Sequence, residues 1–223
     1  NFSTVSFVDS NEGNILMEII KQKEKIKVVI SGAGSAGIAI TKLLHQYGVK
    51  NIILVDSQGI IHKNRTDLNE VKRKICLTTN PENVVGDLKE SLKNADVFIG
   101  VSAPNILQPE LIKEMSDKPI IFAMANPIPE IMPQLAKKAG AYIIATGRSD
   151  FSNQINNALV FPGLFRGVLD NKIKIITDEI KIATAETLAN FLKKDELNVN
   201  KILPEILDVN VSKAIAQTIN NFK

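Results

Sequence analysis

The feature that most constrains how this chain can fold is an apolar run that leads directly into a Gly-x-Gly-x-x-Gly motif. The apolar run is Val28–Ile30, and the three glycines of the motif are Gly32, Gly34 and Gly37. A segment with helical periodicity follows over residues 38–46, and a second apolar run then ends at Asp56. This order predicts a strand, a tight loop, a helix and a second strand.

Each part of this motif meets a physical demand of dinucleotide binding. Gly32 allows a tight turn, Gly34 lets the backbone approach a pyrophosphate, and Gly37 lets the helix pack closely on the strand. The helix N-terminus offers unpaired N–H groups to phosphate oxygens. Asp56 follows Gly37 at about the 20-residue spacing expected of an acid that binds the ribose. We therefore predict cofactor binding by Asp56 and by the loop residues Gly32, Ala33, Gly34, Ser35, Ala36 and Gly37. The alternative is a glycine-rich turn in an ordinary βαβ unit.

Short apolar runs alternate with helical segments along most of the chain. Strands are expected at Val28–Ile30, Ile52–Val55, Val97–Ile99, Ile120–Ala123 and Tyr142–Ala145. Helices are expected at Ile38–Gln46, Gly86–Asn94, Gln108–Met115, Pro129–Ala139, Asp178–Lys194 and Val211–Phe222. Alternation with nearly continuous apolar strands predicts an α/β fold. We expect a Rossmann-like, doubly wound parallel sheet with helices on both faces.

The loops that follow the strands should carry the chemistry, because ligands of open α/β sheets bind at the carboxyl ends of the strands. Ser102 and Ala103 are small enough to let a ribose lie against the backbone. Asn126 offers an uncharged amide to a carboxylate or a carboxamide, although a turn residue before proline is an equal alternative. Asn156 and Asn157 are adjacent amides before an apolar segment, and a capping role for Asn156 stays open.

The composition excludes several classes of function. The net charge of the 223 residues is only +3, which does not favour nucleic acid or a membrane surface. No apolar run approaches the roughly 20 residues that span a bilayer. Cys76 is the one cysteine, which predicts a reducing compartment and a cytoplasmic location.

Candidate groups for proton transfer or metal binding are few. We expect structural roles for the two histidines and two tyrosines, which are His45, Tyr47, His62 and Tyr142. Arg148 and Asp150 are expected to pair with each other. No cluster of carboxylates has the spacing of metal ligands, so we assign no catalytic residue and no metal ligand to this chain.

Several blocks in order resemble the malic enzymes, which oxidise and decarboxylate malate to pyruvate with NAD or NADP. The blocks are Val29–Ala39, Asp96–Ser102, Ile121–Pro127, Ala145–Phe151 and Asn156–Gly167, and the resemblance covers about residues 27–186. It implies the NAD-binding domain of a bacterial-type enzyme, in which Asn126 and Asn157 hold substrate and nicotinamide. Asp56 favours NAD, whereas Lys63 and Arg65 keep NADP possible. The complete family enzyme uses Mg²⁺ or Mn²⁺.

The resemblance also implies parts that this chain largely lacks. The family carries an upstream domain with its catalytic tyrosine and lysine and part of its metal site. Residues 1–25 resemble a remnant of the linker to that domain, and residues 26–223 the NAD(P)-binding domain. Phe7–Asn14 is similar to a family block whose second Asp binds the metal, and Ser10 stands in its place.

We therefore expect oxidation of malate to need a missing N-terminal domain. The chain would form a homo-oligomer or bind a separate partner that carries that domain. The alternative is an inactive dinucleotide-binding module or degenerate paralogue. A weaker alternative is a dehydrogenase of other hydroxy or amino acids.

Overall fold

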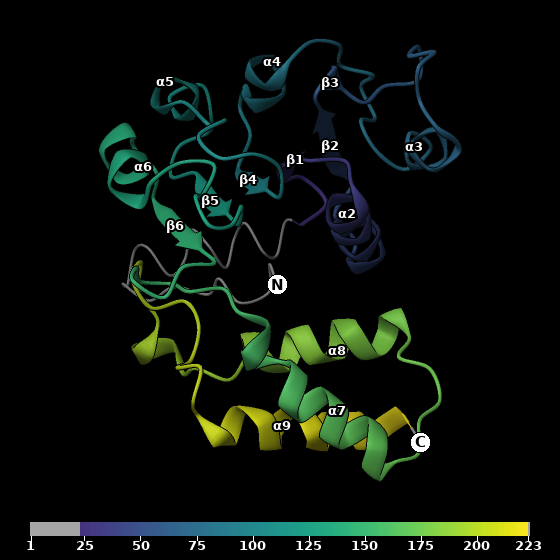
Figure 1. The fold of residues 1–223 in the computed structure, drawn as a ribbon, viewed down its shortest axis with the longest axis vertical. Helices are drawn as coiled ribbons and strands as arrows, with labels where there is room; N and C mark the ends of the chain where they lie inside the picture. Colours follow the sequence, from purple (N-terminus) through teal and green to yellow (C-terminus); the bar gives the residue numbers. More distant parts are fainter. Residues whose placement is uncertain (1–22, 223) are drawn as a thin grey trace. The chain divides into compact units, whose positions relative to one another are not determined.

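The computed structural model describes residues 23–222, so the Phe7–Asn14 block and Ser10 lie outside the described residues. These residues fall into two compact units, one ending at Ser152 and the other beginning at Asn153 (Figure 1). The first unit holds a sheet with its helices, and the second is helical.

A six-stranded sheet in the order β3-β2-β1-β4-β5-β6 forms the centre of the first unit. Its strands are β1 (Lys27–Ser31), β2 (Asn51–Asp56), β3 (Gly59–Ile60), β4 (Val97–Gly100), β5 (Ile120–Ala123) and β6 (Ile143–Thr146). All neighbouring pairs are parallel except β2 and β3, which are antiparallel. The parallel strands are almost wholly buried, as expected for a sheet covered on both faces.

Strand β1 lies between β2 and β4, with Val28 opposite both Ile52 and Val97. The chain winds outward from β1 first toward one edge of the sheet and then toward the other. The loops after β1 and β4 therefore diverge at a topological switch point, which is where open α/β sheets bind their ligands.

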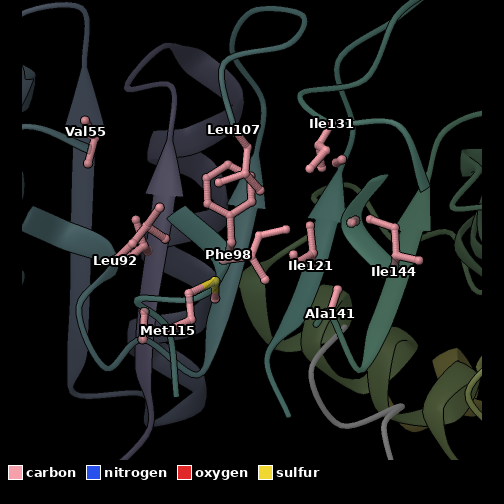
Figure 2. Close-up of a cluster of buried hydrophobic side chains, with 14 of the residues drawn as sticks. Val55, Leu92, Phe98, Leu107, Met115, Ile121, Ile131, Ala141 and Ile144 are labelled. Atoms are coloured by element: carbon pink, nitrogen blue, oxygen red, sulfur yellow. The ribbon is translucent and has the colours of Figure 1, made fainter. Parts of the chain in front are cut away.

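Helices cover both faces of this sheet. The helices are α2 (Ser35–Tyr47), α3 (Glu70–Ile75), α4 (Leu88–Leu92), α5 (Pro109–Ile112) and α6 (Pro133–Ala139). One face of the sheet contributes Val29, Phe98 and Ile121 to a core that also contains Ile112 of α5. Figure 2 shows Phe98 and Ile121 in this core together with Leu92 of α4. Side chains alternate along a strand, so Ile30 faces the opposite side. A Cβ on Gly37 of α2 would lie 3.5 Å from Ile30, which places α2 on that side.

The second unit is built on α7 (Phe161–Asp170), α8 (Asp178–Ala189) and α9 (Val209–Ile219). Short 3₁₀ turns occupy Asn157–Leu159, Lys194–Glu196 and Asn220–Phe222. Helices α7 and α9 pack at close range, because a Cβ on Gly163 would lie 2.5 Å from the Ser212 carbonyl oxygen. A Cβ on Gly167 would lie 2.8 Å from the Cβ of Ile219. The two glycines thus let the helix backbones approach.

The predicted Rossmann-like class is confirmed, and all five expected strands are present. The short antiparallel β3 was not expected, and neither was α7, whose sequence contains Pro162, Gly163 and Gly167. Proline is tolerated in the first turn of a helix, and the glycines serve the contact with α9. Among the described residues, no helix is both long and apolar enough to cross a bilayer.

Candidate functional site

The glycine loop packs tightly against the neighbouring strand ends. The Gly32 N–H donates to the Val55 carbonyl at 2.8 Å, and Gly32 has a φ of +109°, where a side chain would be strained. A Cβ at Gly32 would lie 2.6 Å from the Val101 carbonyl oxygen, and one at Gly37 would lie 1.8 Å from that of Gly32. Glycine is therefore needed at these two positions for the loop to pack, whether or not a ligand binds.

Gly34 differs, because a Cβ there would have no heavy atom within 4 Å. It is exposed and is the residue before α2, so it cannot cap the helix with a side chain. By contrast, Asn69, Asp87 and Thr177 each cap a helix by accepting a backbone N–H. The first turn of α2 also has no acidic residue. The start of α2 therefore leaves both space and N–H groups for an anionic group.

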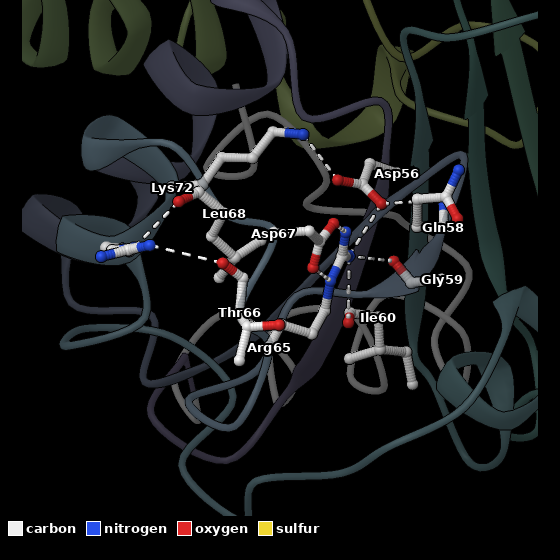
Figure 3. A network of polar contacts seen from close by, with 10 residues as sticks. Asp56, Gln58, Gly59, Ile60, Arg65, Thr66, Asp67, Leu68 and Lys72 are labelled. Carbon is white, nitrogen blue, oxygen red and sulfur yellow. Dashed lines mark hydrogen bonds and ion pairs between the residues drawn. The ribbon is translucent and has the colours of Figure 1, made fainter.

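Asp56 ends β2 at the centre of a polar network (Figure 3). Its Oδ1 accepts from the Gln58 N–H at 2.9 Å and from Arg65 at 2.8 Å, while its Oδ2 accepts from Lys72 at 2.5 Å. Arg65 also binds Asp67 with two nitrogens. Oδ1 already accepts two hydrogen bonds and Oδ2 accepts one, so Oδ2 has acceptor capacity left for a ligand hydroxyl. The Asp56 side chain is 11% exposed.

The charges of this network stabilise one another. Burial raises the pKa of the Asp56 carboxyl, but the hydrogen bonds from Arg65, Lys72 and Gln58 outweigh burial and hold that pKa below its ordinary value. Hydrogen bonding to Arg65 lowers the pKa of Asp67 to about 2. Asp56 and Asp67 balance Arg65 and Lys72 in formal charge. Lys63 is not among the groups that donate to the Asp56 carboxylate, which are Gln58, Arg65 and Lys72.

The loop after β4 lies next to the glycine loop, and the loop after β5 follows it along the same end of the sheet. Ser102 shares a 3.0 Å hydrogen bond between hydroxyls with Ser31 of β1. Ser102, Ala103 and Asn126 are all exposed. Thus the structure brings the predicted cofactor residues of the first unit to one edge of one sheet, although their contact with a cofactor stays a prediction.

The loop after β6 is joined to the loop of Asn126 by Arg148. Its guanidinium binds Asp150 with distances of 2.8 and 2.7 Å, which confirms the expected structural pair. The same side chain donates to the Pro127 carbonyl at 3.3 Å. Asn156 and Asn157 belong to the other unit. The Asn156 side chain accepts from the Ala158 N–H at 2.9 Å, so it does cap a 3₁₀ turn. The substrate role of Asn157 stays a prediction.

Three of the four candidate bases lie away from the carboxyl ends of the strands, and the fourth makes a local contact. His45 and Tyr47 are at the end of α2, about 15 Å from the glycine loop at a rise of about 1.5 Å per residue. Tyr142 precedes β6, at the edge opposite the loops. The His62 Nδ1 accepts from the Asn64 N–H within a local turn at 3.3 Å. Within residues 23–222, no group of three or more His, Cys, Asp or Glu side chains could hold a metal ion.

Two residues of this region were missed by reasoning from sequence. Lys72 contacts Asp56 from α3, a helix that was not predicted. Glu130 is fully buried beneath the loops after β4 and β5. It was assigned to the first turn of an expected helix, where an acidic residue is ordinary, so its sequence position carried no signal of this contact.

Comparison with known proteins places this geometry in a family. Residues 16–222 match the family model of the malic enzyme NAD-binding domain. The chain is 48% identical over 200 residues to the bifunctional malic/malolactic enzyme of Bacillus subtilis, covering 89% of this chain and 49% of that one. It is also 48% identical over 206 residues to the NAD-dependent malic enzyme of Geobacillus stearothermophilus, covering 92% and 43%. The chain thus spans about half the length of these curated relatives.

The solved structures agree. The crystal structure of the NAD-dependent malic enzyme of Thermotoga maritima matches 98% of this chain and 56% of its own, with a TM-score of 0.86 and 44% identity. Both the sequence and the fold are therefore shared over nearly the whole length of the chain. The chain belongs to the malic enzyme family and carries its NAD-binding domain.

Proposed function

We propose that this chain is the coenzyme-binding part of an enzyme that oxidatively decarboxylates malate to pyruvate. Family membership supports the reaction, and the space at Gly34 supports the coenzyme site. A Cβ at Gly32 or Gly37 would clash with protein atoms, whereas the position of a Cβ at Gly34 is open. That contrast is the observation that carries the proposal, because a structural turn alone does not need an open Gly34.

The residues of the chain would bind and orient the coenzyme. N–H groups at the start of α2 would hold the pyrophosphate, and Asp56 Oδ2 would accept a bond from a ribose hydroxyl. Asn126 and Asn157 would donate amide N–H groups to the substrate carboxylate or the nicotinamide carboxamide. Bound NAD would supply the hydride acceptor. We propose that this NAD(P)-binding domain extends from residue 26 to residue 223.

The described residues do not fit a metal site. We propose that the divalent ion and the proton-transfer groups belong to the remaining part of the relatives' length. To test this, malate-dependent NAD reduction is measured with Mg²⁺ or Mn²⁺, for this chain alone and after addition of the upstream half of a relative. Activity only in the mixture supports the proposal, and robust turnover by this chain alone contradicts it.

We further propose that NAD is preferred over NADP. The Asp56 carboxylate would repel a 2′-phosphate, while Arg65 and Lys72 are already engaged by carboxylates. Matched relatives include both NAD-dependent and NADP-dependent malic enzymes, so family membership alone does not decide the choice. Competition titrations of the two coenzymes measure it directly.

A dinucleotide-binding module without catalysis is the second candidate. The open position at Gly34 fits this candidate equally well, because binding of the coenzyme does not by itself require turnover. It predicts NAD binding with no turnover even when the upstream half of a relative is added, which the same assay measures.

We also propose a cytoplasmic location and association with a second copy or a separate partner. Cys76 is buried and free, as expected in a reducing compartment. Helix α7 exposes Phe161, Phe165 and Leu169 along one side, at spacings of four residues. An apolar stripe of this kind is typical of an interaction surface.

A further inference from the structure

Glu130 is a fully buried carboxylate between the two loops that carry Ser102 and Asn126. Its Oε1 accepts from the Ser102 N–H at 2.9 Å, and its Oε2 accepts from the Ala125 N–H, also at 2.9 Å. Its exposed fraction is 0%, and within residues 23–222 no cation is paired with it. Burying a carboxylate without a cation is costly, so packing alone does not explain the residue.

The surroundings hold this carboxylate in one place. The Leu107 N–H donates to the Glu130 carbonyl at 3.0 Å, which fixes the backbone of the residue. A Cβ at Gly100 would lie only 2.3 Å from Glu130 Cδ, so the absence of a side chain at Gly100 makes room for the carboxylate. Gly100 at the end of β4 and the Glu130 side chain therefore fit together without a clash.

The two loops that Glu130 joins lie on one side of the switch point. Asp56 ends β2 on the other side of β1, and a ribose bound there belongs to the adenosine half of NAD. The nicotinamide half then extends over the ends of β4 and β5, where Ser102 and Asn126 lie. Glu130 contacts that half of the site only through the loop backbones.

We propose that Glu130 is a positioning residue that sets the separation between the Ser102 and Asn126 loops, and with it the seat of the nicotinamide half of the coenzyme. This inference rests on the proposed coenzyme function. Each carboxylate oxygen serves one loop, so the pair of bonds acts as a fixed spacer. Glutamine has nearly the same shape, but its NH₂ group would face one of the two N–H donors and lose that bond.

The test compares wild-type protein with Glu130→Gln by calorimetric titration of NAD and, separately, of ADP. ADP probes the adenosine half alone. We expect the NAD dissociation constant to rise about tenfold, as for loss of one hydrogen bond to a charged group, and the ADP constant to stay within about twofold. Glu110→Gln is the matched control, because Glu110 is an exposed acid at the start of the neighbouring helix α5.

Equal weakening of NAD and ADP would show a merely structural role and overturn the inference, as would no weakening of either. Failure of the wild-type protein to bind NAD would overturn the proposed function as well, so the two failures are distinguishable. If circular dichroism shows that Glu130→Gln is unfolded, Glu130→Asp replaces it, with the same selective loss expected. Hydrogen exchange in the wild-type protein adds a test: the amides of Ser102 and Ala125 must be protected, and rapid exchange contradicts the inference.

Discussion

Replacing Gly34 by alanine should separate coenzyme binding from folding. The new Cβ would meet no protein atom within 4 Å, and the backbone angles of Gly34, φ −86° and ψ −165°, are accessible to alanine. We therefore expect the free energy of unfolding to change by at most about 0.5 kcal/mol. A bound pyrophosphate would meet the methyl group. Overpacking of about 1–3 kcal/mol corresponds to a rise of about 5- to 150-fold in the NAD dissociation constant.

Gly37→Ala is the opposite case on the same loop. Its Cβ would lie 1.8 Å from the Gly32 carbonyl oxygen, and real contacts of this kind are essentially never shorter than 3.0 Å. Because the clashing oxygen belongs to the backbone, helix α2 and the glycine loop must separate to relieve the overlap. We expect a loss of stability of about 3 kcal/mol, at the upper end of overpacking.

Urea unfolding followed by circular dichroism measures the stabilities, and calorimetry measures NAD binding. Lys42→Ala, at an exposed position of α2, is the control for both. If Gly34→Ala binds NAD as tightly as the wild-type protein, the pyrophosphate does not lie at Gly34. If it loses as much stability as Gly37→Ala, the site is filled by protein and the reasoning is wrong.

Three further changes test other parts of the site and surface. Lys72→Met removes the cation that offsets the Asp56 charge, so Asp56 should repel a 2′-phosphate more strongly. We expect the affinity for NADP to fall about tenfold relative to NAD in competition titrations. Lys74→Met, which changes an exposed cation of the same helix, should leave that ratio unchanged. Because the folded pKa of Asp56 is depressed, its stabilisation is present above the unfolded pKa of about 3.9 and is lost as pH falls through the folded pKa. The difference in unfolding free energy between wild-type protein and Asp56→Asn should therefore shrink between pH 7 and pH 3 in urea titrations, and a constant difference would contradict the pairing. Phe165→Glu should reduce self-association in light scattering by charging the exposed stripe of α7, and a wild-type protein that is monomeric at high concentration would refute this expectation.

The strands could be located from sequence because buried parallel strands are continuous apolar runs. Strand β4 was expected at Val97–Ile99 and occupies Val97–Gly100. Helix ends were harder to predict. The segment Gly86–Asn94 was expected to be helical throughout, but α4 covers only Leu88–Leu92. Gly86 has a φ of +142° and Asn94 one of +55°, and neither angle fits a right-handed helix.

The parts of the candidate site that belong to a local sequence motif could be predicted. The glycine loop and Asp56 form such a motif, because the glycines follow a fixed pattern and Asp56 follows them at an expected spacing. Lys72 and Glu130 act through contacts between segments that are distant in sequence. Glu130 lies 28 residues from Ser102, and Lys72 lies 16 residues from Asp56. Periodicity does not report such contacts, so only the folded structure shows them.

The most direct test of the coenzyme site is an NMR titration of the ¹⁵N-labelled chain with NAD. We predict saturable shifts of backbone amides in the glycine loop, residues 32–37, together with those of Ser102 and Asn126. The amides at the end of α2, near Tyr47, should not move. Shifts confined to residues away from the sheet loops, or no shift at millimolar NAD, would contradict the proposal that this chain holds the coenzyme at the switch point of its sheet.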